Sequence, residues 1–254
     1  MAHILIMIPT YKEADNVIEL VDRLEKLNID ADILFIDDNS PDGTGTLLDE
    51  CAKKYKNIIV HHRPYKLGIG TAHKSGIAYA YAKQCYTHLI TMDGDFTHPP
   101  EDIPKLLEHS GDYDVVIGGR HAQKSSLEGW SAYRKLLTYT GHQFTSKLLH
   151  LPYDATSAFR VYRIDTIPET TFWLAENPSY PFFFESLCVL NENGHSIYDV
   201  PVVLPPRVAG SSKLKFGDMV NCLILVLILG WKIRIYPEDL KDNIKSLFKK
   251  GPNE

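Results

Sequence analysis

The chain has 254 residues, of which 44% are hydrophobic and 23% charged, an ordinary composition for a globular protein with a substantial core. Its formal net charge of -5 argues against a general nucleic-acid binder, which would more often be basic. The four cysteines lie far apart and form no Cys-x-x-Cys pair, so we expect reduced thiols in a cytoplasmic protein. We expect no signal peptide, because the N-terminus lacks a basic region and a long apolar core.

The first half of the sequence alternates short apolar runs with helical patterns. Five apolar runs predict strands, at Ile4–Ile8, Ile33–Ile36, Ile58–His61, His88–Met92 and Val115–Gly118. Helices are predicted between them, at Asp15–Leu27, Thr44–Tyr55 and Gly70–Lys83. This alternation predicts an α/β fold, with a mostly parallel central sheet covered by helices.

Polar turns follow three of these predicted strands, at Pro9–Glu13, Asp37–Asp42 and Asp93–Asp95. Ligands of open α/β sheets bind at the carboxyl ends of strands, so we expect the three turns to meet in one cleft. Asp93 and Asp95 place two carboxylates one residue apart, a pair that suits Mg²⁺ carrying a diphosphate. Taken alone, the pair is also compatible with a solvated turn that holds two ordinary acidic residues.

The second half of the sequence has a different character. Its segments are a predicted helix at Trp130–Leu149, a polar stretch at Asp154–Tyr162, an aromatic and then helical region at Pro178–Glu192, a predicted strand at Ser196–Leu204 and a basic loop at Arg207–Lys215.

The apolar run Met219–Trp231 is too short to span a bilayer, which takes about twenty residues. It predicts either a core helix or a helix in the membrane interface. Flanking Lys213, Lys215, Lys232 and Arg234, together with Trp231, suit the interfacial position. We therefore divide the chain into a domain at 1–217 and a C-terminal apolar or amphipathic helical segment at 218–254.

Five motifs, in their order and spacing, resemble those of family 2 glycosyltransferases: Pro9–Glu13, Asp37–Thr44, Leu67–Ala72, Met92–Asp95 with His98-Pro99, and Gly118–Arg120. Within that family the chain resembles the dolichol-phosphate mannose synthases, through Ser40–Thr44, Asp154 with Ser157–Arg160, and Arg207–Lys213. The resemblance extends to about residue 231. It implies a GT-A fold, a nucleotide-sugar donor (GDP-mannose is favoured), Mg²⁺ or Mn²⁺, and a polyprenyl or dolichyl phosphate acceptor at the cytoplasmic face of a membrane.

The resemblance also implies roles for single residues. Pro9, Tyr11, Glu13, Ile36 and Asp38 would surround the base and ribose, while Gly94 would let the backbone approach the sugar. Asp93 and Asp95 would hold the metal, with Thr97 as a candidate third ligand. Arg207 and Lys213 would bind the donor diphosphate, and Arg120, Arg134, Ser157 and Arg160 the acceptor phosphate. Asp95, Arg120 and Arg207 are the expected catalytic residues.

Several positions depart from the pattern of the mannose synthases, among them Pro205-Pro206 and the stretch Trp173–Phe183. Gly94 stands where alanine is usual, Thr97 where glutamine is frequent, and Ala158 where glycine is usual. These departures lie on the sugar and acceptor side, so the transferred sugar is less strongly implied than the family.

The resemblance leaves three kinds of protein open. The first kind is an inverting enzyme that transfers mannose to a polyprenyl phosphate. Such a phosphate acceptor is already largely a dianion at neutral pH, so the transfer needs no general base. The second kind is a related enzyme that moves another sugar, such as glucose from a UDP donor, or that glycosylates a hydroxyl acceptor. A hydroxyl acceptor would require a general base, for which Glu185 is the candidate. A non-catalytic nucleotide-sugar-binding module is the third, although the presence of Asp93, Asp95, Arg120 and Arg207 argues against it. The sequence does not identify any protein partner, so partners stay unknown.

Overall fold

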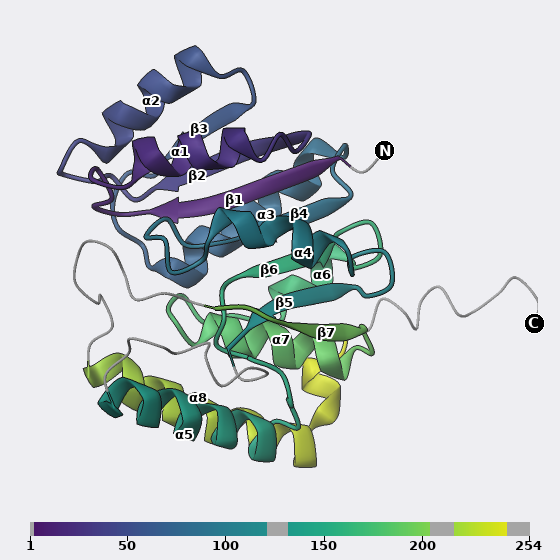
Figure 1. The fold of residues 1–254 in the computed structure, drawn as a ribbon. Helices are drawn as coiled ribbons and strands as arrows, with labels where there is room; N and C mark the ends of the chain where they lie inside the picture. Colours follow the sequence, from purple (N-terminus) through teal and green to yellow (C-terminus); the bar gives the residue numbers. More distant parts are fainter. Residues whose placement is uncertain (1–2, 121–131, 204–215, 243–254) are drawn as a thin grey trace, which may run out of the picture.

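The structure is a computed structural model and describes residues 3–120, 132–203 and 216–242. A seven-stranded sheet with the strand order β3-β2-β1-β4-β6-β5-β7 forms its centre (Figure 1). The strands are β1 (Ile4–Thr10), β2 (Ala31–Asp37), β3 (Ile58–His62), β4 (His88–Thr91), β5 (Val115–Gly119), β6 (Arg160–Arg163) and β7 (Ile197–Pro201). The five strands predicted in the first half are confirmed, with ends moved by one to two residues.

Six of the strands run in one direction, and β6 runs against them between β4 and β5. The sheet is therefore mostly parallel, as predicted. The position of β6 corrects the interpretation of the segment 154–162 as a polar stretch. Its four residues begin with Arg160 and are too few to show an apolar pattern.

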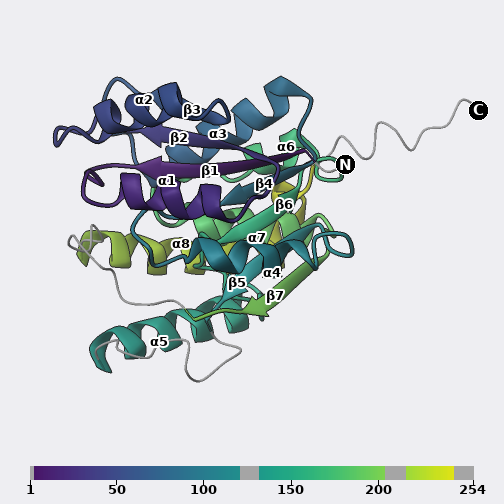
Figure 2. The ribbon, with the colours of Figure 1, turned by 45° about the horizontal axis from the view of Figure 1, so that its top comes forward.

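Helices cover both faces of the sheet. Successive residues of a strand point to opposite sides, so the continuous apolar strands present apolar side chains on both faces. On one side, Ile4, Ile6 and Ile8 of β1 pack in a core cluster with α1 (Val17–Lys26), α2 (Thr44–Lys54) and α4 (Ile103–Leu107). On the other side, Leu5 and Met7 pack in a second cluster with α3 (Ile69–Lys83), α6 (Glu169–Trp173) and α7 (Phe182–Glu192). The two layers are visible in Figure 2.

A further pair of helices, α5 (Ala132–Leu148) and α8 (Phe216–Ile235), forms an outer layer beyond α7 (Figure 1). Val226 and Leu229 of α8 join the second core cluster, whereas Ile224, Leu227 and Trp231 are at least half exposed. Both interpretations of the run 219–231 therefore have support, because one face of α8 packs on the core and another faces outward. The division of the chain at residue 217 stays a prediction. Among the described helices, none has the length and hydropathy that crossing a membrane would require.

Candidate active site

Loops at the carboxyl ends of β1, β2 and β4 meet in a cleft of about 270 Å³. The predicted residues that line it are Pro9, Tyr11, Glu13, Asp38, Asp93, Gly94 and Asp95. Ile36 lies beneath the cleft in β2, fully buried, and its carbonyl accepts a long hydrogen bond from the Thr10 hydroxyl at 3.5 Å. The convergence of the three turns is therefore observed, while the contacts of these residues with a nucleotide remain predictions.

The three loops hold unusual backbone conformations. Lys12, Asn39 and Phe96 have positive φ angles of 58°, 52° and 62°, and each follows one of the strands β1, β2 and β4. Such conformations are disfavoured for residues other than glycine and persist where the surroundings enforce them. Phe96 is buried in the core and lies 4.8 Å from the guanidinium of Arg23. The loops are thus preformed walls of the cleft.

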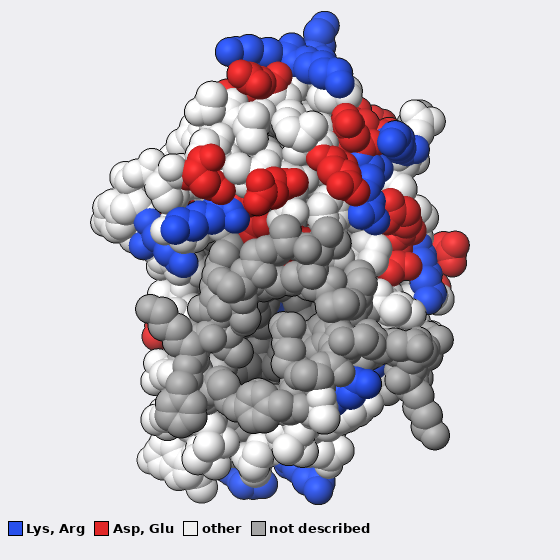
Figure 3. Space-filling view, turned by 60° about the vertical axis from the view of Figure 1, so that its left-hand side comes forward, with Lys and Arg blue, Asp and Glu red and all other residues white. Residues whose placement is uncertain are grey.

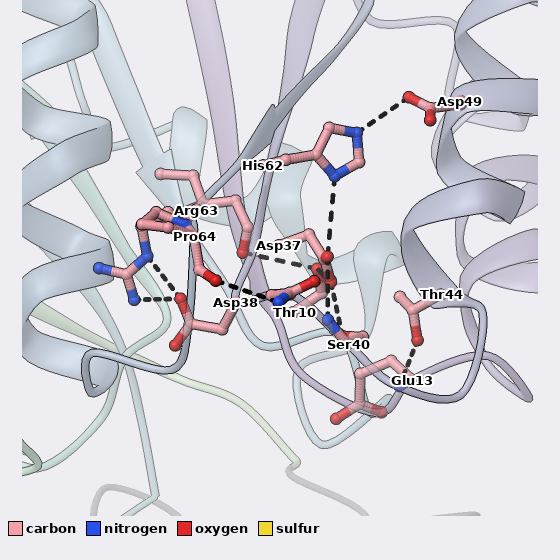
Figure 4. A network of polar contacts seen from close by, with 12 residues as sticks. Thr10, Glu13, Asp37, Asp38, Ser40, Thr44, Asp49, His62, Arg63 and Pro64 are labelled. Carbon is pink, nitrogen blue, oxygen red and sulfur yellow. Dashed lines mark hydrogen bonds and ion pairs between the residues drawn. The ribbon is translucent and has the colours of Figure 1, made fainter.

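Hydrogen bonds between the loops lock the first two walls together (Figure 4). The amide of Lys12 donates to the Ser40 hydroxyl at 3.1 Å, and the amide of Glu13 donates to the Thr44 hydroxyl at 2.9 Å. The Ser40 hydroxyl in turn donates to Asp37 at 2.5 Å. These bonds explain why a Ser-Pro-Asp-Gly-Thr turn follows β2, since its hydroxyls satisfy the backbone of the loop after β1.

A buried ion pair holds Asp38 at the cleft. The guanidinium of Arg63 donates to the Asp38 carboxylate, and both side chains are nearly inaccessible to solvent (Figure 4). Burial raises the pKa of Asp38 above its usual value, against the opposing attraction of Arg63. Arg63 also donates to the Thr71 hydroxyl at 2.8 Å and to the Gly68 carbonyl at 3.2 Å. Arg63 therefore ties Asp38 to the start of α3.

Sequence reasoning missed both Arg63 and Lys66. Lys66 lines the cleft, and its ammonium lies 4.0 Å from the centre of the Tyr11 ring. Both precede the motif Leu67–Ala72, so a search for cations beside that motif could have found them. Acidic and basic side chains are interspersed on the upper half of the face toward which β1 and β2 point (Figure 3).

The two carboxylates of the Asp-x-Asp motif have different surroundings. Asp95 is buried, and its Oδ1 accepts hydrogen bonds from the Thr97 amide at 3.1 Å and the Thr97 hydroxyl at 2.6 Å. The Asp93 side chain is 32% exposed in the cleft, and its amide donates to Nδ1 of His98 at 2.8 Å. Burial lowers the pKa of His98, which favours the neutral ring that this hydrogen bond requires. Thr97 and His98 thus fix the motif.

The carboxylate pair fits a hard divalent cation. Carboxylate oxygens are the ligands that Mg²⁺ and Mn²⁺ prefer, and one or two of them with substrate phosphates is a usual arrangement. Within the described residues, His, Cys, Asp and Glu form no cluster of three or more that could hold a metal by themselves. Water and substrate phosphates are the usual further ligands of such a cation. Thr97 as a third ligand stays a prediction, and in the structure it donates to Asp95.

Arg120 lies at the end of β5, where a single carboxylate fixes its guanidinium. Its Nε and Nη2 donate to the two oxygens of Asp154, each at 2.7 Å, and its amide donates to Asp154 at 3.0 Å. The guanidinium is close enough to Asp93 for their charges to interact. The fold thus brings Arg120 near the Asp-x-Asp motif.

Two of the predicted acceptor residues lie inside the protein. Arg160 is fully buried and donates to the carbonyls of Ala155 at 2.8 Å and Phe183 at 2.9 Å. Ser157 is also buried and donates to the Gly118 carbonyl at 2.8 Å. In this structure both side chains therefore brace the loop before β6, and neither faces solvent. Of the remaining cations, Arg207 and Lys213 lie outside the described residues, as does the side chain of Arg134 in α5.

Glu185 lies in the first turn of α7 and is buried. Its carboxylate accepts a hydrogen bond from the Asn177 amide at 2.8 Å. Burial raises its pKa above the usual value, against the effect of the backbone hydrogen bonds. A raised pKa suits a general base, but it also suits a structural carboxylate.

The family model for glycosyl transferase family 2 matches residues 5–168. The chain therefore belongs to glycosyltransferase family 2 and is a glycosyltransferase. The predicted family, class of enzyme and α/β fold are confirmed.

Two curated relatives match nearly the whole chain. One is an undecaprenyl-phosphate mannosyltransferase from Micrococcus luteus, 32% identical over 232 residues that cover 91% of this chain and 95% of the relative. The other is a polyprenol monophosphomannose synthase from Mycolicibacterium smegmatis, 30% identical over 233 residues that cover 91% of this chain and 87% of the relative.

A solved structure supports the same architecture. It is a mannosyltransferase from Pyrobaculum calidifontis in complex with GDP-Man and Mn²⁺, with a TM-score of 0.55 at 13% identity. The match covers 91% of this chain and 64% of that chain. At this identity the likeness concerns the GT-A fold alone.

Proposed function

We propose that the protein transfers mannose from GDP-mannose to a polyprenyl monophosphate, with inversion at the anomeric carbon. It would act as a peripheral protein on the cytoplasmic face of a membrane. The observation that carries the proposal is the position of Arg120, a cation held rigidly by Asp154 and close to Asp93. A fixed guanidinium beside the diphosphate site favours an anionic acceptor, as the names of both curated relatives also do.

The donor would lie along the cleft between the loops after β1, β2 and β4. Tyr11, backed by Lys66, offers an aromatic face to the base, and Asp38 offers an acceptor for base or ribose donors. Pro9, Glu13 and Ile36 complete this end. The diphosphate would extend toward Asp93, Gly94 and Asp95, with Arg207 and Lys213 as its cationic partners.

The metal site would serve the leaving group. Bound by Asp93 and Asp95, Mg²⁺ or Mn²⁺ would offset the negative charge that develops on the departing GDP. Asp95 is the less mobile ligand, because its Oδ1 accepts two hydrogen bonds from Thr97. Asp93, being partly exposed, can adjust to the diphosphate.

The acceptor phosphate would attack without a general base. One of its oxygens bonds to the anomeric carbon as the bond from that carbon to the GDP oxygen breaks, so the configuration inverts. The second pKa of a phosphate monoester is about 6, so at neutral pH no base has to remove a proton from it. The protein then contributes position and charge, through Arg120 and Arg134, with Ser157 and Arg160 supporting the loop that carries Asp154.

The outer face of α5 and α8 would rest on the membrane. The exposed apolar side chains of the two helices include Leu136, Tyr139, Phe144, Val220, Leu223, Ile224, Leu227, Ile228, Trp231 and Ile235. Lys232 and Arg234 follow in the last turn of α8, where they can meet anionic headgroups. A membrane contact here would keep a lipid tail near the protein.

Transfer assays with matched acceptors test the proposal. Polyprenyl phosphate in liposomes should be mannosylated, while the corresponding free alcohol should not. GDP-mannose with Mn²⁺ should raise the melting temperature more than UDP-glucose does, since a ligand bound only to the native state stabilises it. Preference for UDP-glucose, or for the free alcohol, would overturn the proposal.

A hydroxyl acceptor is the second candidate, supported by the raised pKa of Glu185. In that case Glu185→Gln should abolish most turnover, because the acceptor proton would have no base. With a phosphate acceptor the same variant should keep most of its activity. The two acceptor classes are thus separated by one substitution.

A further inference from the structure

The residues that orient Arg120 form a chain of contacts that ends at a second carboxyl group. Asp154, which fixes the guanidinium, is itself almost completely buried. Its amide donates to Oδ2 of Asp199 at 3.0 Å. Asp199 belongs to β7, so the contacts run from Asp199 through Asp154 to Arg120.

Asp199 is packed tightly against β5, the strand that ends just before Arg120. Its carboxyl group lies beside Gly119, where a Cβ atom would fall 1.9 Å from Oδ1. No side chain fits there, so glycine is required for this approach. The same Oδ1 is buried and has no hydrogen-bond partner among the described residues. Of the two oxygens of Asp199, one therefore holds Asp154 and the other is unsatisfied.

The surroundings of Asp199 favour its protonated form. The charged groups that face it are Asp154 from the loop before β6, Arg120 after β5, and Arg160 in β6. Lys105 of α4 donates to the carbonyl of Pro201, two residues further along β7. Burial, together with the charge of Asp154, raises the pKa of Asp199 to about 7, despite both arginines.

We propose that Asp199 is a positioning residue for the acceptor phosphate, holding Asp154 and Arg120 in place and tuning the charge of their cluster by its own protonation. The proposal rests on the proposed function, in which Arg120 binds the acceptor phosphate. With Asp199 neutral, the cluster of Arg120, Arg160 and Asp154 carries one net positive charge, which attracts a phosphate dianion. With Asp199 ionised, the net charge of the cluster is zero and this attraction is lost. Acceptor binding should therefore weaken as the pH rises through neutrality.

The substitution Asp199→Asn separates the two parts of this role. Asparagine keeps an oxygen for the Asp154 amide but stays neutral at every pH. Asp199→Ala removes the oxygen as well, so the loop loses its anchor. The probe is a short water-soluble isoprenyl phosphate, whose binding is measured directly by calorimetry at pH 6 and pH 8.5, in the presence of GDP and Mn²⁺.

The quantity compared is the dissociation constant of the wild type divided by that of Asp199→Asn. We expect this ratio to rise about three- to tenfold from pH 6 to pH 8.5, which is the scale of one partly screened charge. The ionisation of the phosphate itself cancels in this ratio. GDP affinity should be the same in both proteins. Asp199→Ala should bind the probe more weakly at both pH values.

Parallel pH profiles of the wild type and Asp199→Asn would overturn the proposal, as would a wild type that does not bind the probe. An equal change in GDP affinity would indicate a general structural effect and would also overturn it. Because binding is measured without turnover, a wild type that binds the probe with the expected pH dependence but transfers no sugar to it would contradict the proposed function alone.

Discussion

The loops of the proposed donor cleft differ from the outer helices α5 and α8 in what their side chains contact. In the cleft loops, polar groups that follow different strands bond to one another, as Lys12 does with Ser40 and Arg63 with Asp38. In the outer helices, apolar side chains such as Leu227 and Trp231 face outward. The cleft loops are held by internal hydrogen bonds and ion pairs. The outer helices expose apolar side chains, as surfaces that bind an apolar partner do.

This difference fits the two substrates of the proposed reaction. A nucleotide sugar carries many donors and acceptors, and fixed loops can match them at defined distances. A polyprenyl chain carries none, so an apolar surface suffices for it and its length need not be matched. We therefore expect substitutions in the loops to change turnover and donor affinity, and substitutions on α8 to change only the response to membranes.

The largest effect should come from Asp95→Asn. The variant keeps an oxygen for the two Thr97 donors, so the loop should fold, but the metal site loses one charge. We expect kcat to fall on the order of a hundredfold, the scale of one lost preorganised electrostatic contact. Steady-state assays in Mn²⁺ measure it, with Asp165→Asn, in a surface ion pair with Arg163, as the matched control. Turnover close to wild type in Asp95→Asn would remove the metal assignment.

Next in size should be the effect of Arg63→Met on stability. The substitution leaves Asp38 buried without its counter-ion, which typically costs about 3–5 kcal/mol. Donor KM should rise at the same time, because the orientation of Asp38 is lost. Arg163→Met, which breaks a more exposed pair, should cost about 1 kcal/mol or less.

Urea unfolding of both variants measures this difference. The double variant Arg63→Met with Asp38→Asn should recover part of the stability, since no charge is then buried alone. If Arg63→Met were no less stable than Arg163→Met, the ion pair between Arg63 and Asp38 would not stabilise the cleft loops.

The outer helices should respond to membranes alone. Ile224→Asn combined with Leu227→Asn should weaken binding to anionic liposomes at least about tenfold, because two half-exposed apolar side chains are lost. Transfer to a short soluble isoprenyl phosphate should be unchanged. Ile18→Asn, an exposed apolar position on α1, should leave liposome binding as it is. Equal losses in all assays would contradict the separation of the two regions.

A further effect should be a pH dependence of stability that originates at Asp199. Its pKa in the folded protein is raised from 3.8 to about 7, so the folded state holds this proton more tightly than the unfolded state. Its contribution to stability is therefore lost as the pH rises from about 4 to about 7, and does not change further above that. The melting temperature of Asp199→Asn minus that of the wild type should rise between pH 5 and pH 7 and then level off. A difference independent of pH would show that Asp199 does not titrate in this range.

Much of the first half of the chain could be predicted from the sequence, because each of its strands is a continuous apolar run and three of them are followed by polar turns. The rule that ligands bind at the carboxyl ends of strands also predicted that Tyr11, Asp38 and Asp93 lie in one cleft. It could not find Arg63, whose partner Asp38 is 25 residues away in the chain. Nor could it find Asp199, which acts through tertiary contacts with the loop at Asp154, 45 residues away. The burial of Arg160 was not foreseen when the resemblance assigned it to the acceptor phosphate, since nothing in the local sequence indicates that a lone arginine starts a buried strand.

The reversed direction of β6 has one more consequence for the enzyme. In a wholly parallel sheet, only segments that follow strands reach the catalytic edge. A reversed strand delivers the segment that precedes it, so residues 154–159 enter the site from the opposite chain direction. The proposed acceptor region can therefore be remodelled by insertions ahead of β6 without altering any loop of the proposed donor site. Diversification of acceptor choice among related enzymes should accordingly concentrate in that segment.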